Sequence, residues 1–309
     1  MNYTLHQLQV FLKIKETKSI TKTAKELFLT QPAVSIQFKN FQDQFEIPLI
    51  DIIGKRIHIT EFGLEIAVLA EKIINEVYAI NYKTLAFKGI LSGKLKIAIV
   101  STGKYIMPYF LTDFLNQHEG IDLKMDVTNK LKVLESLENN EIDFALVTLL
   151  PKDLNVEEEI LMENQLYLVG KKQDQLNETI HDKSISNNIP LIYRESGSGT
   201  RLIMEGFFEK TKINFGKKIE LTSNEAVKQA IIAGLGYSLM PLIGIHNELA
   251  NEQLKIIKVN GLPIQSSWRL IWLKNKKLAP VAQHFLEYIR TNKADILQKH
   301  FTWINDVPN

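Results

Sequence analysis

Apolar residues recur at helical spacing through the first sixty residues of the chain. A first helix is expected near the N-terminus, around Leu5, Leu8, Phe11 and Leu12. A second helix should begin after Ser19, a typical N-cap residue, and a third after Thr30. Apolar residues of the third helix follow each other at intervals of four, three and four, which predicts one buried stripe made of Val34, Phe38, Phe41 and Phe45.

The opposite face of this third helix is polar and nearly free of acidic residues. Short polar side chains on a helix can reach base edges and phosphates in the major groove of DNA. Two short apolar runs follow, around the basic turn Gly54-Lys55-Arg56, and we interpret them as a two-stranded wing. A small helical domain with a merely amphipathic third helix is the alternative, and the pattern leaves the two about even. The residues expected to contact DNA are Lys22, Thr30, Gln31, Pro32, Ser35, Gln37, Lys39, Lys55 and Arg56.

Residues 61–88 predict a single long helix. Within it, residues repeat every seven positions in two interleaved series that start at Ile66 and Ala70. Such a repeat is typical of helices that pair between subunits, and a helix packed against its own chain is the alternative. The strictness of the repeat and the lack of a second long helix nearby favour a dimer. The residues expected at its interface are Ile66, Ile73, Val77, Ile80 and Phe87.

From Leu91 onward, predicted strands alternate with amphipathic helices, which is typical of an α/β domain. Three of the strands end in hydroxyl residues, and ligands of open α/β sheets bind at the carboxyl ends of the strands. Any one of these hydroxyls is explained as well by a turn or a helix cap. Strands are expected at 95–100, 123–127, 144–148, 166–169, 190–193, 237–240, 254–259 and 269–273.

A Ser/Gly loop at 196–200 gives a sharper signal. It follows a predicted strand, precedes a predicted helix, and is flanked by Arg194 and Arg201, two of only five arginines in the chain. Glycines allow close backbone approach and a helix N-terminus favours negative charge, so an anion site is favoured over a flexible surface turn. The residues expected to contact the anion are Ser101, Thr102, Gly103, Thr128, Thr148, Ser196, Gly197, Ser198, Gly199, Thr200 and Arg201.

The charge balance differs along the chain. Its 309 residues include 37 basic and 35 acidic side chains, for a net charge of +2. Residues 1–60 hold eight basic and five acidic residues, so this segment carries +3 and the remainder −1. Because each phosphate contact adds to DNA affinity, a segment with so small a charge should bind weakly alone. Tight DNA binding should therefore need at least a dimer.

Composition also excludes several functional classes. The chain has no cysteine, which rules out disulfides and thiolate chemistry. Its seven histidines show no metal-ligand spacing and no nucleophile elbow occurs, so we expect neither an enzyme nor a cofactor. No signal peptide and no apolar stretch of transmembrane length is visible, so we expect a cytoplasmic protein that does not bind membranes.

Four short motifs together resemble the N-terminal domain of LysR-type transcriptional regulators: Ala24-Lys-Glu-Leu27, Thr30-Gln-Pro-Ala-Val-Ser35, Pro48-Leu49 and Thr60-Glu-Phe-Gly63. The resemblance covers the whole chain. It implies a winged helix-turn-helix domain at 1–60, a linker helix at 61–90 and a periplasmic-binding-protein-like effector domain at 91–309. In that domain, subdomain I would span 91–164 and 268–309, and subdomain II would span 165–267.

The Ser/Gly loop resembles that of the subgroup that contains Calvin-cycle operon regulators and certain cysteine-pathway regulators. This implies a small anionic metabolite as effector, besides double-stranded DNA as partner. A homo-oligomer is also implied, a dimer through the linker helix and then a tetramer, with RNA polymerase as a candidate partner. The alternative function is a cytoplasmic small-anion-binding protein of the solute-binding type without a specific DNA function, which would have no use for residues 1–60.

Some positions depart from the family pattern. Ile36 stands where a basic residue is usual, Gln42 where Glu is usual, and Glu46 where Gly is usual. The wing has Ile50-Asp51-Ile52 in place of Phe-x-Arg. These changes remove two cations and add acid, so they bear on the DNA sequence that is read and on the strength of binding.

Overall fold

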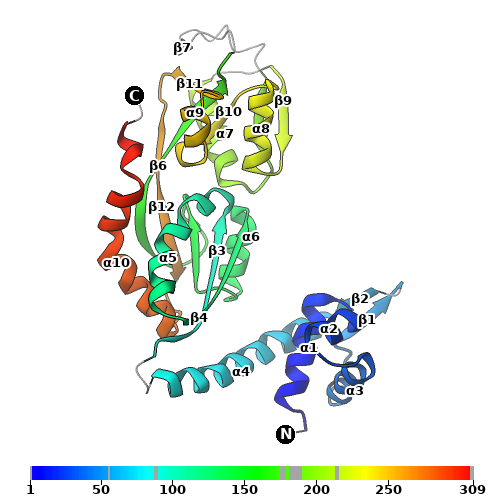
Figure 1. Ribbon diagram of the computed structural model, residues 1–309. Helices are drawn as coiled ribbons and strands as arrows, with labels where there is room; N and C mark the ends of the chain where they lie inside the picture. The colour runs from blue at the N-terminus through cyan, green and yellow to red at the C-terminus, as the bar shows by residue number, and fades with distance from the viewer. Residues whose placement is uncertain are drawn as a thin grey trace. The chain divides into compact units, whose positions relative to one another are not determined.

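The computed structural model describes residues 2–54, 56–86, 90–173, 179–180, 190–212 and 216–306. The chain divides into two compact units, Met1–Ile90 and Leu91–Asn309, and each is described by itself. Figure 1 shows the helices of the first unit and the mixed helices and strands of the second. Within the described ranges, no helix is both long enough and apolar enough to cross a membrane.

Three short helices open the N-terminal unit: α1 (Leu5–Thr17), α2 (Ile20–Glu26) and α3 (Gln31–Gln42). Each begins at a hydroxyl residue whose side chain accepts a hydrogen bond from a backbone N–H of the first turn, which would otherwise lack a partner. These N-caps are Thr4, Ser19 and Thr30. The helix starts predicted at Ser19 and Thr30 are therefore confirmed.

A hairpin and a long helix complete this unit. Strands β1 (Ile50–Ile53) and β2 (Arg56–Ile59) pair antiparallel, as the wing interpretation predicts. Thr60 then starts α4 (Glu61–Ala86): its hydroxyl accepts from Gly63 N–H at 2.9 Å and donates to the Pro48 carbonyl at 2.7 Å. A Cβ at Gly63 would lie 2.1 Å from the Leu49 carbonyl oxygen, so this close approach requires glycine. The contact joins the Pro48-Leu49 and Thr60–Gly63 motifs.

The core of the N-terminal unit is aromatic. Phe11, Phe38 and Phe41 are buried, and Phe11 lies with its ring centroid 5.4 Å from that of Phe41. The first half of α4 contributes three buried side chains to the same cluster: Ala67, Ala70 and Ile74. Ile66 packs at the edge of this cluster. Because α4 supplies part of the core, its first three turns belong structurally to the helical unit.

The third helix is shorter than predicted. It ends at Gln42, so Phe45 lies in the following loop, although its ring still packs on Phe41 at 5.1 Å between centroids. The side chain of Gln42 accepts from Leu49 N–H at 2.7 Å and donates to the Ile47 carbonyl at 3.1 Å. A carboxylate accepts only, so the amide at this position holds the loop by two bonds where glutamate would hold it by one.

The C-terminal unit is built on a mixed sheet in the order β4-β3-β5-β12-β6-β11-β7, with β10 also paired to β6. A separate parallel pair is formed by β8 (Leu191–Arg194) and β9 (Lys218–Leu221). The remaining strands are β3 (Ser92–Val100), β4 (Gly120–Thr128), β5 (Phe144–Val147), β6 (Val156–Lys171), β7 (Thr179–Ile180), β10 (Ser238–Pro241), β11 (Leu254–Val259) and β12 (Ile264–Leu273).

Helices cover both faces of each half of this sheet (Figure 1). In the first half, α5 (Met107–Gln117) and α10 (Pro280–His300) pack on one face and α6 (Lys130–Glu138) on the other. In the second half, α7 (Gly199–Thr211) and α8 (Asn224–Ala233) pack on opposite faces. The short α9 (His246–Ala250) and three 3₁₀ turns, Ser101–Tyr105, Leu242–Gly244 and Thr302–Asp306, complete the described elements.

Two long strands join the halves. β6 and β12 pair antiparallel from Val156↔Leu273 to Leu166↔Ile264, with a register shift at Trp268/Arg269. The predicted strands at 166–169 and 269–273 are only parts of them. The acidic run Glu157-Glu158-Glu159 conceals the first half of β6 from a hydropathy pattern. Glu158 pairs with Arg269 of β12, and Glu159 pairs with basic residues of α10, so neither enters the core.

Candidate functional site

A recess that opens to solvent lies where the two halves of the C-terminal unit meet. The first half contributes residues at the carboxyl ends of β3, β4 and β5. The second half contributes the end of β8 and the starts of α7 and α8. This placement follows the rule that ligands of open α/β sheets bind at strand ends. Its lining residues are Val100, Ser101, Thr102, Asn129, Lys130, Thr148, Arg194, Ser198, Gly199, Thr200 and Asn224.

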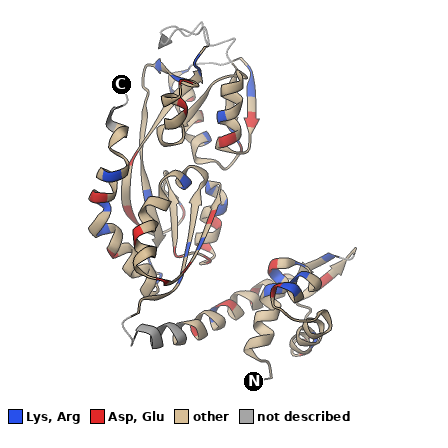
Figure 2. Cartoon of the chain, in the orientation of Figure 1, with Lys and Arg blue, Asp and Glu red and all other residues tan. Residues whose placement is uncertain are grey.

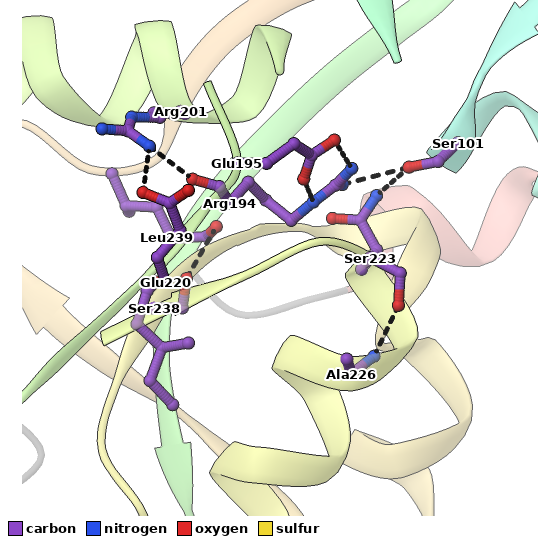
Figure 3. A network of polar contacts seen from close by, with 11 residues as sticks. Ser101, Arg194, Glu195, Arg201, Glu220, Ser223, Ala226, Ser238 and Leu239 are labelled. Carbon is purple, nitrogen blue, oxygen red and sulfur yellow. Dashed lines mark hydrogen bonds and ion pairs between the residues drawn. The ribbon is translucent and has the colours of Figure 1, made fainter. Parts of the chain in front are cut away.

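Ser101 is at the centre of a buried hydrogen-bond network (Figure 3). Its hydroxyl oxygen accepts from Arg194 Nη1 at 3.0 Å and from Asn224 Nδ2 at 2.7 Å. The guanidinium of Arg194 is also held by Glu195, with Nε and Nη2 each 2.8 Å from a carboxylate oxygen. The Arg194 side chain is only 5% exposed, so this ion pair is largely shielded from water. The network ties the first half of the unit to the second.

Lys130 is the second cation that lines the recess. It is the first residue of α6, directly after the N-cap Asn129, and it makes no ion pair among the described residues. Burial lowers the pKa of its ammonium group below the usual value, and the positive charge of Lys152 lowers that pKa further. Among the residues that the structure describes, none supplies a counter-charge to this ammonium group.

The start of α7 faces Lys130. A Cβ added at Gly199 would lie 3.7 Å from Thr148 Oγ1 and 3.9 Å from Lys130 Cδ, so this glycine keeps the recess open between them. Ser198 occupies the N-cap position of α7 without a side-chain cap bond, so the first N–H groups of the helix have no side-chain acceptor. Unpaired N–H groups and the helix dipole make such a terminus favourable for an anion.

Six of the eleven predicted anion-contacting residues line the recess: Ser101, Thr102, Thr148, Ser198, Gly199 and Thr200. Five lie elsewhere. Gly103 packs on Leu146 and Ile99 within a 3₁₀ turn, so Ser101 to Gly103 do not begin an α-helix. Among the rest, Ser196 is exposed, Gly197 packs against Leu131, and Thr128 ends the edge strand β4 outside the recess.

Arg201 is the fifth of these residues, and its guanidinium points away from the recess (Figure 3). It pairs with Glu205 at 2.8 Å and Glu220 at 2.7 Å and donates to the Arg194 carbonyl. Arg201 therefore braces β8, β9 and α7 together. Arg269 and Arg290 likewise pair with glutamates of β6. Proximity in sequence to a Ser/Gly loop did not identify which arginine faces the site.

Five lining residues were not among the predicted contacts: Val100, Asn129, Lys130, Arg194 and Asn224. Arg194 flanks the predicted loop. Asn224 follows the residue that caps α8, since the Ser223 hydroxyl accepts from Ala226 N–H. Asn129 and Lys130 directly follow the predicted strand 123–127 and its terminal Thr128. Their position after the end of a strand was the signal that could have identified them, but only Thr128 was included in the prediction.

The predicted DNA-contacting residues lie on the surface of the N-terminal unit. Gln37 is half-buried, Lys55 lies outside the described residues, and Thr30 also caps α3. Figure 2 shows α3 with almost no charge, whereas lysines colour α1 and α2. Ile36 is 57% exposed on the same helix, in the place of the usual cation. The exposed predicted residues are Lys22, Thr30, Gln31, Pro32, Ser35, Lys39 and Arg56.

The seven-residue repeat of α4 is only partly available to a second subunit. Ala70 is buried in the core of its own unit and Ile66 packs against that core while staying partly exposed, so the place of Ile66 at an interface stays a prediction. Further along the helix, Ile73 is 40% exposed, Ile80 is 64% exposed and Val77 is half-buried. Phe87 lies outside the described residues. Among the described part of the chain, no cluster of three His, Asp or Glu side chains could hold a metal ion.

Comparison with known proteins agrees with both units. Residues 5–64 match the model of the bacterial regulatory helix-turn-helix protein, lysR family, and residues 88–294 match the LysR substrate binding domain. The chain is 38% identical over 292 residues to the transcriptional activator CmpR of Synechocystis, covering 93% of this chain and 95% of the relative. It is 34% identical to a RuBisCO operon transcriptional regulator of Acidithiobacillus ferrooxidans, with coverage of 94% and 95%.

Solved structures give the same picture. The regulatory domain of Synechocystis CcmR in complex with 2-PG has a TM-score of 0.61 at 29% identity and covers 68% of this chain and 99% of its own. Full-length CbnR complexed with its target DNA shares the fold, with a TM-score of 0.67 at 18% identity and coverage of 93% and 99%. The RuBisCO operon relatives confirm the resemblance to Calvin-cycle operon regulators. The chain belongs to the LysR family of bacterial transcriptional regulators.

Proposed function

We propose that this LysR-type regulator binds a small anionic metabolite in the recess between the two halves of its C-terminal unit, and that occupancy changes how its N-terminal unit binds DNA. Donors for an anion converge there from strands and helices of both halves. Occupation would therefore bias the angle between the halves, because a ligand shifts an equilibrium when it binds one arrangement better than another.

The observation that carries the proposal is the excess of donors without an acidic partner. Thr102 and Ser198 are 5% and 3% exposed, line the recess, and make no side-chain hydrogen bond among the described residues. Lys130 and the start of α7 face the same space. These groups face the open recess, where a bound molecule or water can accept hydrogen bonds from them. The CcmR complex with 2-PG, a related regulatory domain, supports a metabolite in that role.

The domain layout and assembly belong to the same proposal. Residues 1–60 would contact DNA, residues 61–90 would link and pair subunits, and 91–309 would hold the effector. Subdomain I would comprise 91–164 and 268–309, and subdomain II 165–267. Exposed apolar side chains of α4 support pairing: Leu69 is 54% and Ile73 40% exposed. A two-fold dimer would place two copies of α3 on a dyad-symmetric operator.

Calorimetry of the full-length protein against anionic metabolites, beginning with 2-PG, tests the effector site. We expect at least one anion to bind the wild type, and Ser101→Ala to weaken that anion about 10-fold or more. Ser136→Ala, on α6 away from the recess, is the matched control. If no anion binds, or if Ser101→Ala binds like the control, the effector proposal is wrong.

A gel shift with DNA from a random pool enriched by the wild-type protein tests the DNA arm. The anion should change the affinity or mobility of the wild-type complex and leave that of Ser101→Ala unchanged. A protein that binds the anion but shifts no DNA across a range of salt concentrations would favour the solute-binding alternative.

A further inference from the structure

The recess holds two cations, and the structure gives them different roles. We propose that Lys130 supplies the charge that balances the anion, whereas Arg194 is a positioning residue that fixes the Ser101 hydroxyl as a donor. The inference rests on the effector site proposed above and goes beyond it, because it states which groups select the ligand and what the ligand must present to them.

The charge of Arg194 is already matched within the chain. Glu195 accepts two hydrogen bonds from its guanidinium, and the two side chains are 5% and 15% exposed. A bidentate pair of this kind is strong and is costly to open when water is excluded. An anion that paired with the Arg194 guanidinium would have to compete with the carboxylate of Glu195, the next residue in the chain. The pair therefore contributes little net charge to the recess.

Lys130 has no such partner. No carboxylate lies within ion-pair distance of its ammonium group among the described residues. Its stem passes the uncapped start of α7, where backbone N–H groups also favour negative charge. The depressed pKa of Lys130 agrees with this geometry, since burial and Lys152 both penalise its charged form. A bound anion would remove that penalty.

Ser101 has a defined hydrogen-bonding direction. A hydroxyl has one donor and two acceptor sites, and both acceptor sites are used, by Arg194 Nη1 at 3.0 Å and Asn224 Nδ2 at 2.7 Å. Its proton must therefore donate, and no acceptor in the described chain takes it. The effector should thus present an acceptor oxygen, such as that of a carboxylate or phosphate, at Ser101. An amide nitrogen placed there would offer no acceptor to the Ser101 proton.

Two variants of the full-length protein separate the roles, with calorimetry of 2-PG, or the tightest-binding anion of the panel, as the readout. Lys130→Met should weaken binding about 10- to 100-fold. The matched control is Lys132→Met, an exposed lysine of the same helix, which should change binding less than about threefold. Lys130→Arg should retain most of the affinity, because it keeps the charge.

The second variant, Arg194→Gln with Glu195→Gln, removes both charges of the pair together. It should lose no more affinity than Ser101→Ala, and adding Ser101→Ala to it should cost little more, because both act through one hydroxyl. A role that is merely structural would not show this non-additivity. The loss from Lys130→Met should persist on either background.

Two outcomes would overturn the inference. One is a loss for Arg194→Gln/Glu195→Gln that exceeds the loss for Lys130→Met and adds to that of Ser101→Ala. The other is unchanged anion binding in Lys130→Met, which decides the matter even if the double variant fails to fold. If wild-type protein binds no anion, the proposed function itself fails, and that result is distinct from both.

Discussion

The exposed face of α3 takes its polar residues from one stretch, Gln31–Gln42, whereas the recess draws its lining from segments between Val100 and Asn224. The first surface is local: a cap, a proline in the first turn and an apolar stripe on the other side determine which residues face out. The second depends on how strands pair. A surface on one helix can be predicted from spacing, while a recess between two halves depends on contacts that spacing does not contain.

The two surfaces also differ in charge. α3 presents neutral polar side chains, an exposed isoleucine and one exposed lysine, Lys39. The recess presents donors without acids except for the Arg194–Glu195 pair. Substitutions on α3 should therefore change DNA affinity and leave effector affinity unchanged. Substitutions in the recess should change effector affinity and leave the DNA affinity of the effector-free protein unchanged.

The largest effect is expected from Asn224→Asp. A carboxylate at this position would accept the Ser101 proton and repel an anion, so effector affinity should fall about 100-fold or more. DNA binding without effector should be unchanged. Calorimetry and a gel shift measure the two effects, with Gln229→Glu, an exposed residue of α8, as the control for the added negative charge. Equal losses in both variants would mean that only net charge matters.

The next effect concerns pH. Because the pKa of Lys130 lies below its usual value, its charge is lost at a lower pH than for an exposed lysine. Anion affinity should be fully present below that pKa and should fall as pH rises through it, by up to the factor lost in Lys130→Met. Lys152 acts on Lys130 through its charge, and the Arg194–Glu195 pair is the other charged group that the described residues place at the recess. Calorimetry over a pH series should give a flat profile for Lys130→Arg; a sloping one would assign the titration to another group.

A smaller effect should follow from Ile36→Arg, which restores the usual cation on α3. One added phosphate contact should steepen the slope of log affinity against log salt by about 0.9. Fluorescence anisotropy with the enriched DNA measures that slope. Ile160→Arg, at an isoleucine of β6 that is 45% exposed, should leave it unchanged. An unaltered slope in Ile36→Arg would place position 36 away from the phosphates.

The smallest effect is expected from Arg201→Ala. Its guanidinium pairs with Glu205 and Glu220, which are 41% and 51% exposed, so stability should fall by about 1 kcal/mol or less. Effector affinity should stay within about threefold of wild type. A loss as large as that of Ser101→Ala would restore Arg201 to the anion site.

The sequence was informative where chemistry and local geometry coincide. Ser19 and Thr30 start helices because their hydroxyls cap them, and the start of α7 was predicted because the Ser/Gly loop precedes an amphipathic helix. It failed where two segments meet. Arg194 and Arg201 both flank the Ser/Gly loop, so the sequence does not distinguish them. In the structure Arg194 donates to Ser101, whereas Arg201 donates to Glu220. Likewise, Ile66 fits the seven-residue repeat of α4, but its side chain packs against the core of its own unit.

The most direct test of the account is a crystal structure of the full-length protein with the tightest-binding anion of the panel. The account predicts an anionic oxygen within hydrogen-bond distance of Ser101 Oγ and another near Lys130 Nζ, with Arg194 still bidentate on Glu195. An anion bound elsewhere, or an Arg194 that has left Glu195 to pair with the anion, would contradict it.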